Sequence, residues 1–458
     1  MIELFADRIF DGARFVERPL CITIEGETIA SVRSRSADER LPPGGIDARG
    51  HTVLPGLIDA HTHIGRAGQF EAHEPPNPGA IVRNLEAALE GGVTTVGDMG
   101  CTAALIRVLR EHTHRTPDAG PAVRASGPLL ADPGGYPLDW MSDFHRRIGA
   151  AIPCGDENSA RAAVERLARA GMDHVKICIM HRSYGYQELP VFSPEVARAF
   201  VAEAHALGLR VFAHAHWEAD YRLALDAGVD ALMHSSFDPL SEETVLRVRD
   251  AGIPVCPTLW VFHSACFGLE QRWDRDPERG RGVVRAVRKS WTRYAEAYAA
   301  SGLWVPDGIA GGATKEQGRE AIRVAAANLC LLSDAGVPFA FGSDGPFGFS
   351  VIGRPLDELQ IWESAGLSRE QCLGYATAGS ARLLGLDDRG TIADGRRADL
   401  VIVDGDPRRD LDVLRRPATV IRAGVPVTRR HRLRNAAAVA VGLGNTLLDA
   451  ARDLARDL

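Results

Sequence analysis

Hydrophobic and polar positions follow a mixed pattern through the middle of the chain. From about residue 57 to residue 384, short apolar runs alternate with longer stretches that repeat apolar residues at helical spacing. This order is typical of parallel strands joined by crossover helices. The predicted strands cover residues 57–63, 94–98, 122–126, 174–179, 210–214, 231–234, 254–257 and 339–342. Eight such strands predict an α/β fold, a (β/α)8 TIM-like barrel.

Glycine follows three of the predicted helices directly, as expected at a helix C-terminus. These helices cover residues 157–170, 194–207 and 318–335, and the glycines are Gly171, Gly208 and Gly336. The connection before the last strand, residues 263–316, is unusually long. It carries Trp291, Tyr294 and Tyr298 at helical spacing, which predicts packing against the barrel or a second subunit, with a lid over the site as the less favoured interpretation.

Near both chain ends, apolar and polar residues alternate with the two-residue period of strands. Residues 20–24 and 29–32 flank one turn, and residues 398–403 follow the Asp394-Gly395 turn. We therefore expect one small β-sandwich built from both ends. The predicted parts are this sandwich (1–55 and 386–435), the barrel (56–385) and an amphipathic C-terminal helix (436–458).

Composition narrows the classes of partner. The 458 residues are 45% hydrophobic and carry a net charge of −7, without the dense basic face that a nucleic acid requires. The first residues show no basic segment followed by an apolar stretch, and no apolar run reaches about 18 residues, so we expect neither a signal peptide nor a membrane span. The eight cysteines form no CxxC pair, which is typical of reduced thiols. We expect a cytoplasmic homo-oligomer that acts on a small molecule, without nucleic acid or membrane as a partner.

Residues able to bind a metal end several predicted strands. Two positions separate His61 from His63, so their side chains leave the first strand on the same face and can share one ion. Each candidate alone has a simpler explanation as a core histidine, a solvated lysine or a helix-capping aspartate. Together they lie at the C-terminal strand ends, where barrel active sites are built. The candidates are His61, His63, Lys176, His214, His234 and Asp344.

Three motifs give the chain a family resemblance. The segment PGLIDAHTH at 55–63, GVTTV at 92–96 and the closing stretch 390–401 resemble the opening, second-strand and closing motifs of the metal-dependent amidohydrolase superfamily. Within it, Val175-Lys176-Ile177 followed by His214-Ala215-His216 is similar to the branch of prolidase-like dipeptidases and of hydrolases of ureas and carbamates.

The resemblance implies a binuclear metal centre. A free lysine, with a pKa of about 10.4, is protonated and binds no cation, whereas carboxylation makes Lys176 an anionic ligand that bridges two ions. His61 and His63 would bind one ion, and His214 and His234 the other. Asp344 would contact the first ion and the bridging water, and act as general base. Zinc is the expected metal, although manganese, cobalt and iron suit the same ligands.

Further residues are candidates for contacts with the substrate. Tyr136 follows the third strand and would polarise the substrate carbonyl, or merely pack in a glycine-rich loop. His216 would contact the substrate, or support the ligands from outside. Aromatic residues just past the strand ends predict an apolar pocket, or simply fill loops. They are Trp140, Trp217, Trp260, Phe262, His263 and Phe347.

The expected reaction is hydrolysis of an amide, urea or carbamate C–N bond in a small molecule. A deaminase of this superfamily typically has a glutamate three residues after the fifth-strand histidine, where this chain has Trp217. A lactonase, a dipeptidase and a non-catalytic relative stay open. A dipeptidase needs a cation for the substrate carboxylate, and spacing favours none of Arg124, Arg182 and Arg319. We therefore expect a neutral, partly aromatic substrate, because a buried carboxylate without a cation is costly.

Overall fold

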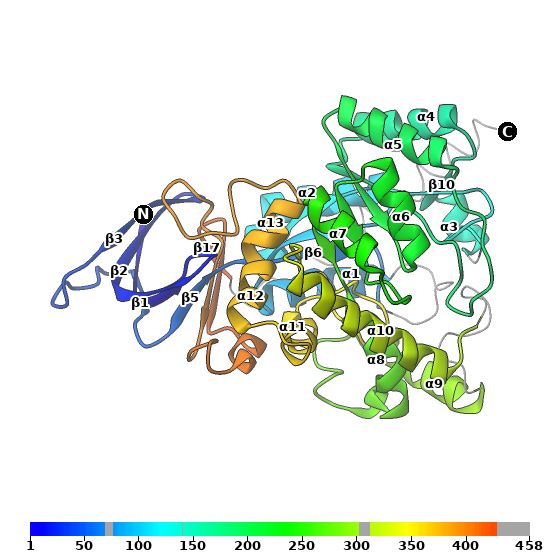
Figure 1. Cartoon of the computed structure of the whole chain (residues 1–458). Helices are drawn as coiled ribbons and strands as arrows, with labels where there is room; N and C mark the ends of the chain where they lie inside the picture. Colours follow the sequence, from blue (N-terminus) through cyan, green and yellow to red (C-terminus); the bar gives the residue numbers. More distant parts are fainter. Residues whose placement is uncertain (69–76, 140, 302–311, 428–458) are drawn as a thin grey trace.

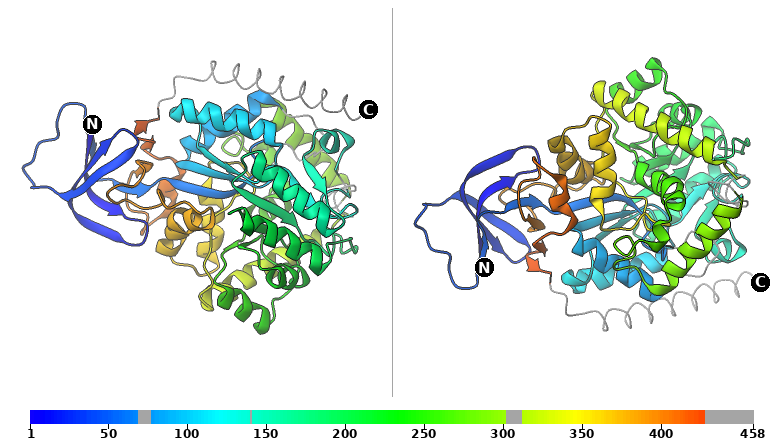
Figure 2. Two further views of the ribbon diagram at one scale, coloured as in Figure 1. Left: turned by 90° about the horizontal axis from the view of Figure 1, so that it is seen from above. Right: turned by 90° about the horizontal axis from the view of Figure 1, so that it is seen from below.

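Two parts with different secondary structure lie side by side in the computed structural model (Figures 1 and 2). It describes residues 1–68, 77–139, 141–301 and 312–427. A β-rich part at one end contains the N-terminus, and a larger part of strands and helices occupies the other end. The predicted C-terminal helix and Trp140 lie outside the described residues.

Strands from both chain ends form the β-rich part. They are β1 (Ile2–Phe10), β2 (Phe15–Glu25), β3 (Thr28–Ser34), β4 (Ile46–Ala48), β5 (Thr52–Pro55), β15 (Leu400–Val403), β16 (Thr419–Arg422) and β17 (Val425–Pro426). They pair in the order β17-β16-β15-β5-β1-β2-β3, and β4 also pairs with β1.

The described strands of this part form one continuous sheet, which corrects the expected sandwich of two sheets. A register shift between Ala6 and Arg8 divides β1. Its first half pairs with β4 and its second half, through Ile9 and Val53, with β5. A bulge of this kind bends a strand, so one sheet can curve around a core that two sheets would otherwise enclose. Leu4, Ile22, Leu400 and other apolar side chains fill that core.

Parallel strands form the centre of the larger part. They are β6 (Leu57–Thr62), β7 (Val93–Asp98), β8 (Ala122–Ala125), β9 (Leu129–Ala131), β10 (Ala151–Pro153), β11 (His174–Cys178), β12 (Arg210–His214), β13 (Ala231–Met233) and β14 (Val255–Cys256). β9 and β10 were not predicted. The last predicted strand, 339–342, forms an isolated parallel bridge between Phe339 and Val255 instead of a full strand.

These strands form a curled sheet. β6, β7 and β8 pair in one group, and β10-β9-β11-β12-β13-β14 in another. Asp173 N donates to Ala125 O at 2.9 Å, which links the two groups on one side. On the other side Ala340 N donates to Val255 O at 3.0 Å, and Ala60 N donates to Phe341 O at 2.8 Å. The C-terminal ends of the strands are thereby directed toward a common region.

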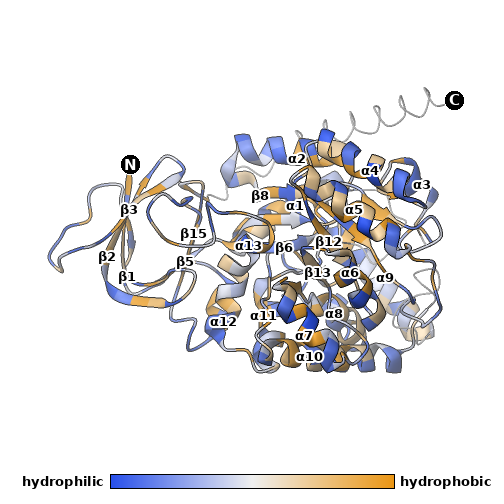
Figure 3. Cartoon of the chain, turned by 45° about the horizontal axis from the view of Figure 1, so that its top comes forward, coloured by the Kyte–Doolittle hydropathy of each residue, from blue (hydrophilic) through white to orange (hydrophobic). Residues whose placement is uncertain are grey.

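Helices cover the outside of this curled sheet (Figure 1). They are α1 (Pro78–Glu90), α2 (Ala103–Arg115), α3 (Asp143–Arg147), α4 (Glu157–Arg169), α5 (Pro194–Ala206), α6 (Glu218–Ala227), α7 (Glu242–Ala251), α8 (Leu259–Glu270), α9 (Arg285–Ser301), α10 (Lys315–Asp334), α11 (Pro355–Ser364), α12 (Arg369–Gly374) and α13 (Ser380–Leu383). Figure 3 shows mainly hydrophobic central strands and helices of mixed character around them. No described helix has the length and apolar character that crossing a membrane requires.

The three helices predicted from glycine signals are α4, α5 and α10, to within a few residues at each end. Helix α9 contains the predicted aromatic stripe. Trp291, Tyr294 and Tyr298 are buried, and the Trp291 indole donates to Gly68 O at 2.9 Å. The stripe therefore packs within the subunit.

A single glycine joins the two parts of the molecule. β5 ends at Pro55 and β6 begins at Leu57, so Gly56 alone separates them. Gly56 N donates to Asp399 O at 2.7 Å. A Cβ atom at this position would lie 2.1 Å from Thr94 Oγ1, so no larger residue fits. The strand that carries His61 is thus a direct continuation of the β-rich sheet.

Candidate metal centre

Two groups of possible metal ligands lie next to each other at the C-terminal strand ends. In the first, the ligating atoms of His61, His63 and Asp344 all lie within 4.8 Å of one another. The same holds for His214, His216 and His234 in the second. The ring centroids of His61 and His234 are 4.7 Å apart, and His234 Nδ1 lies 3.8 Å from Asp344 Oδ2. The structure thus brings together the histidines and the aspartate of the expected site, and adds His216.

Lys176 is the exceptional residue of the site. It lies within β11 with only 1% of its surface exposed. Among the described residues its Nζ has no hydrogen-bond partner. Burial lowers the pKa of Lys176 to about 8, because a low-dielectric interior disfavours the charged amine. A buried amine without a partner is costly unless it is modified or binds a further group.

The buried histidines are held in the form that binds metals. Burial lowers the pKa of His61, His214 and His234 well below 6.5, and that of His216 to about 3. They are therefore neutral near pH 7, and metal ligation requires neutral imidazoles. Within the described part of the chain, His61 Nδ1 and His214 Nε2 have no hydrogen-bond partner. The donors present thus fit divalent metal ions.

Backbone and hydroxyl groups orient several imidazoles. The Nδ1–H groups of His63 and His216 donate to the carbonyls of Gly100 and Ser235, at 3.4 and 3.3 Å. These contacts leave Nε2 of both rings with a lone pair toward the site. His63 Nε2 lies 3.1 Å from Asp344 Oδ1. His234 Nδ1 is hydrogen-bonded to the Thr258 hydroxyl at 2.8 Å.

Two of the candidate ligands adopt an unusual backbone conformation. His234 has φ +79° and Asp344 has φ +50°. Positive φ is uncommon for residues other than glycine and costs free energy, so it persists where the surroundings enforce it, often at functional sites. Here the enforcing contacts are backbone hydrogen bonds: His234 N donates to Cys256 O and Asp344 N to His61 O, both at 2.8 Å.

Two buried aspartates hold the loops that carry the first group. Asp98 accepts from Ile64 N at 2.7 Å and from Gly100 N at 3.1 Å. Asp59 accepts from Ser343 N at 2.9 Å, next to Asp344. Burial raises the pKa of Asp59 to about 7 and that of Asp98 to about 6. Both contribute to the position of the ligands rather than to the ligand set.

Two tyrosines line the site. The Tyr136 ring stacks on His214 with a centroid distance of 4.5 Å and an angle of 20°. The Tyr184 hydroxyl donates to His216 Nε2 at 3.3 Å. Sequence reasoning missed Tyr184, although it lies in the loop after β11, where residues of barrel active sites commonly lie.

Some of the expected aromatic residues reach the histidines and others do not. The Phe262 ring lies 5.0 Å from His216, and Phe237, which was not predicted, stacks on His216 at 4.5 Å. Trp217 instead donates its indole hydrogen to Arg182 O. Trp260 stacks between His263 and Trp273, at 5.5 and 5.4 Å. The aromatic wall of the site is therefore smaller than predicted.

The charged residues considered for the alternative functions are engaged elsewhere. Arg124, Arg182 and Arg319 each form an ion pair at 2.6 Å, with Asp173, Asp238 and Glu270 respectively. Glu218, the nearest acid for a deaminase, accepts hydrogen bonds from Ser241 and Thr244. None of the three arginines is thus available as an anchor without breaking its pair.

A different arginine, not identified from the sequence, lies in the loop after the first ligand strand. Arg66 lies three residues after His63, with its guanidinium 5.3 Å from the centre of the Phe347 ring. The described residues offer it no ion-pair partner. Burial lowers the pKa of Arg66, and the charges of Tyr136 and Asp344 act in the opposite direction.

Comparison with known proteins gives one family and several relatives. The amidohydrolase family model matches residues 52–427. An uncharacterised protein of Mycobacterium tuberculosis is 30% identical over 60% of this chain, and the chain spans only 64% of the length of that relative. Ochratoxinase of Aspergillus niger is 26% identical over 76% of this chain and 68% of its own length. The structure of a putative prolidase from Bifidobacterium longum is 25% identical, with a TM-score of 0.72 over 97% of this chain and 98% of that one.

Proposed function

Because the chain belongs to the amidohydrolase family, whose model matches residues 52–427, we propose that it is a metal-dependent hydrolase of a small molecule. The bond cleaved is the C–N bond of an amide, urea or carbamate. The likeness to an ochratoxinase and to a putative prolidase supports hydrolysis of C–N bonds. In this proposal the curled sheet is a (β/α)8 barrel whose last strand is residues 339–342.

The proposed ligand sets follow the two groups of residues. His61, His63 and Asp344 would hold one divalent ion, and His214 and His234 the other. A carbamate on Lys176 would bridge the two, which would relieve the unpartnered buried amine. The bound ions would supply Lewis acidity and lower the pKa of a water molecule, so that hydroxide is available near neutral pH. Zinc remains the expected metal.

The chain's own side chains handle the proton and orient the substrate. An Asp344 carboxylate oxygen accepts a proton from the attacking water and later returns it to the leaving nitrogen. Tyr136 donates a hydrogen bond to the substrate carbonyl oxygen, where negative charge develops. Tyr184 and His216, hydrogen-bonded to each other, form the adjacent wall and exclude water from the scissile bond.

One observation carries this proposal above the others: a buried lysine, whose Nζ has no hydrogen-bond partner in the described part of the chain, lies among buried neutral histidines. A structural core would not gather these groups, because each costs free energy when its polar atoms are unsatisfied. A non-catalytic relative would have no reason to keep them.

Elemental analysis and an amide-hydrolysis assay on the same preparation test the proposal. We expect about two divalent ions per chain and hydrolysis that a chelator abolishes and added metal restores. His61→Ala should lose metal and activity together. His205→Ala is the matched control, since His205 is 46% exposed and pairs with Asp230. A metal ratio near zero would exclude the site, and a ratio near one would exclude the binuclear arrangement.

Arg66 supports a second candidate substrate class. The Arg66 cation, three residues after His63, would suit an amide that carries a carboxylate near the scissile bond, such as a dipeptide or an N-acyl amino acid. This contrasts with the neutral substrate expected from the sequence, for which no anchoring cation was apparent. A panel of N-aryl amides, carbamates, dipeptides and N-acyl amino acids separates the two classes.

The effect of Arg66→Met decides how the panel is interpreted. If Arg66 binds the carboxylate, the variant should lose about tenfold or more in kcat/KM for the acidic substrates and little for neutral ones. Arg319→Met provides the control, because Arg319 pairs with Glu270. Equal losses on both substrate types would mean that Arg66 supports the loop only. If the wild-type protein prefers neutral substrates, the neutral, partly aromatic substrate expected from the sequence is favoured instead.

A further inference from the structure

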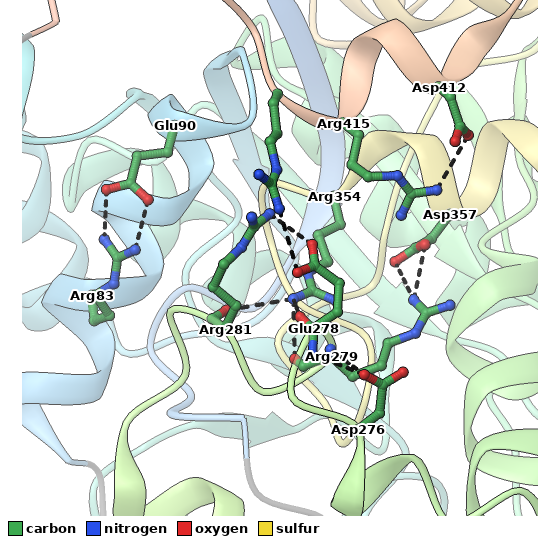
Figure 4. A network of polar contacts seen from close by, with 11 residues as sticks. Arg83, Glu90, Asp276, Glu278, Arg279, Arg281, Arg354, Asp357, Asp412 and Arg415 are labelled. Carbon is green, nitrogen blue, oxygen red and sulfur yellow. Dashed lines mark hydrogen bonds and ion pairs between the residues drawn. The ribbon is translucent and has the colours of Figure 1, made fainter.

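A cavity of about 470 Å³ lies between the larger part and the β-rich part of the molecule. On one side are α1 and the loops before α9 and α11, and on the other are residues 414–417. None of the candidate metal ligands lines it. Its walls come from the end of α1, the loop around residues 278–282, the segment 351–357 and residues 414–417. Cavities of this size commonly hold small molecules. Figure 4 shows the charged residues around it.

Arginine dominates the charged lining. Five arginines face three acids, and the residues are Arg83, Arg281, Arg354, Arg415, Arg416, Glu90, Glu278 and Asp357. Asp357 is already engaged, because Arg279 contacts both of its oxygens at 2.9 Å. Glu278 is shared, since it lies 3.0 Å from Arg281 and 3.5 Å from Arg416. Arg415 pairs with Asp412 outside the lining, at 3.2 Å. Arg281, Arg354 and Arg416 are therefore left with the single carboxylate of Glu278.

Arg354 has no acidic partner at all within the described residues. Its Nη2 donates instead to the carbonyls of Glu278 and Arg279, at 2.6 and 3.0 Å. These contacts fix the guanidinium against the turn without forming an ion pair with a described carboxylate. Because Arg354 is half-buried, an anion beside it would be attracted more strongly than one at a fully exposed arginine.

A second set of contacts fixes the wall of the cavity that Arg83 and Glu90 of α1 form. Arg83 contacts Glu90 with both terminal nitrogens, at 2.6 and 3.1 Å, and its Nε donates to Gly282 O at 3.0 Å. The backbones behind it are in close contact. A Cβ atom on Gly91 would lie 1.9 Å from Gly353 O. The wall formed by Arg83, Gly91 and Gly353 is thus held by specific contacts, whereas Arg416 on the other side is 68% exposed.

From these contacts we propose that the cavity binds a small molecule carrying a dianionic phosphate group. The anion would lie between Arg354 and Arg416 and compete with Glu278 for Arg416 and Arg281. Planar guanidinium groups match phosphate oxygens with paired hydrogen bonds. Remaining cavity volume would accommodate the rest of the ligand. Such a ligand would also tie the segment that follows Asp344 to the β-rich part.

Isothermal titration of the metal-loaded protein with inorganic phosphate tests this site, with succinate as a dianionic carboxylate for comparison. Arg416→Gln should weaken phosphate binding about tenfold or more. Glu278→Gln should strengthen it, because it removes the competing carboxylate. Arg323→Gln is the matched control, since this arginine is 68% exposed and pairs with Glu320 on α10. If Arg354→Gln folds, it should abolish phosphate binding. If it does not fold, Arg416→Gln and Glu278→Gln decide whether phosphate binds in this cavity.

Three outcomes would overturn the inference. Absence of phosphate binding excludes the site, and tighter binding of succinate excludes phosphate as the ligand class. Phosphate binding that His61→Ala removes and Arg416→Gln leaves unchanged would place the anion at the metal centre instead. None of these readouts depends on hydrolytic activity, so failure here leaves the proposed hydrolase function untouched.

Discussion

The Asp220 carboxylate accepts a hydrogen bond from the ring of His181 at 2.5 Å. It also accepts from the backbone nitrogens of His216 and Trp217, at 3.0 and 2.9 Å. His181 lies in the loop after β11, and His216 in the loop after β12. One fully buried carboxylate therefore joins the segments that follow Lys176 and His214.

Replacement of Asp220 by asparagine should move these two loops. The amide has one accepting oxygen instead of two, so at least one N–H group would be left unsatisfied. We expect the free energy of unfolding to fall by about 1–3 kcal/mol. Asp220 is a positioning residue, so turnover should also fall while metal content is retained. Denaturant unfolding and steady-state kinetics measure both, with Asp226→Asn, 55% exposed, as control. An unchanged kcat in a destabilised variant would limit Asp220 to a structural role.

Lys176→Ala should abolish metal binding and activity, because it removes the proposed bridging ligand. Short carboxylates such as acetate or propionate should restore part of both, since they can occupy the space of the missing carbamate. Lys289→Ala on the exposed face of α9 serves as the control. Metal content by elemental analysis and hydrolysis with and without propionate are the measurements. Full metal content in Lys176→Ala would show that the lysine is no ligand.

Asp344→Asn should separate proton transfer from folding. The amide keeps the shape of the carboxylate but cannot accept the proton of the attacking water. Turnover should drop by at least roughly a hundredfold, the usual scale of general acid–base catalysis. Circular dichroism and elemental analysis should show the fold and most of the metal in place. Near-normal turnover would mean that another group moves the proton.

Glu358 should give the stability of the protein a pH dependence. This buried carboxylate accepts from Leu259 N, Trp260 N and the Trp362 indole, at 2.9, 2.5 and 2.8 Å. Burial raises the pKa of Glu358 to about 7, above the ordinary 4.5. Between these values the folded protein binds more protons than the unfolded chain, so the free energy of unfolding falls as pH rises.

Glu358→Gln removes this contribution, which amounts to up to about 1.4 kcal/mol per pH unit. Urea unfolding across the range from about pH 5 to about pH 8 should therefore show a shallower fall for the variant. The comparison uses the difference between the two slopes, because Asp59 and Asp98 also have raised pKa values in both proteins. Parallel curves would show that Glu358 ionises normally.

The hydrophobic pattern predicted the strands that carry His61, Lys176, His214 and His234, because a fully buried strand needs a continuous apolar run. It also predicted the helix ends at Gly171, Gly208 and Gly336, since each adopts a positive φ that glycine alone accepts readily. The family resemblance is confirmed by the family match over residues 52–427.

The hydrophobic pattern could not identify residues whose contacts depend on the course of the loops. Arg66, Tyr184 and Asp220 have no periodic signal, and their contacts depend on how loops far apart in sequence meet. β9 and β10 were missed for a related reason: each is only three residues long, too short for alternation to be visible. The single β-rich sheet depended on a bulge in β1, which no residue type marks.

The glycine link between the two parts has a consequence for how the chain matures on the ribosome. Gly56 is fixed by Asp399, and β5 pairs along its length with β15, which lies near the other end of the chain. His61 and His63 are the first candidate ligands to be synthesised, and β5, which leads into their strand, can pair early with β1 through Val53 and Ile9. It gains β15 as its second neighbour only when that strand has emerged. Chains truncated before Leu400 should therefore lack this second neighbour of β5, and we expect them to hold less metal than the full chain.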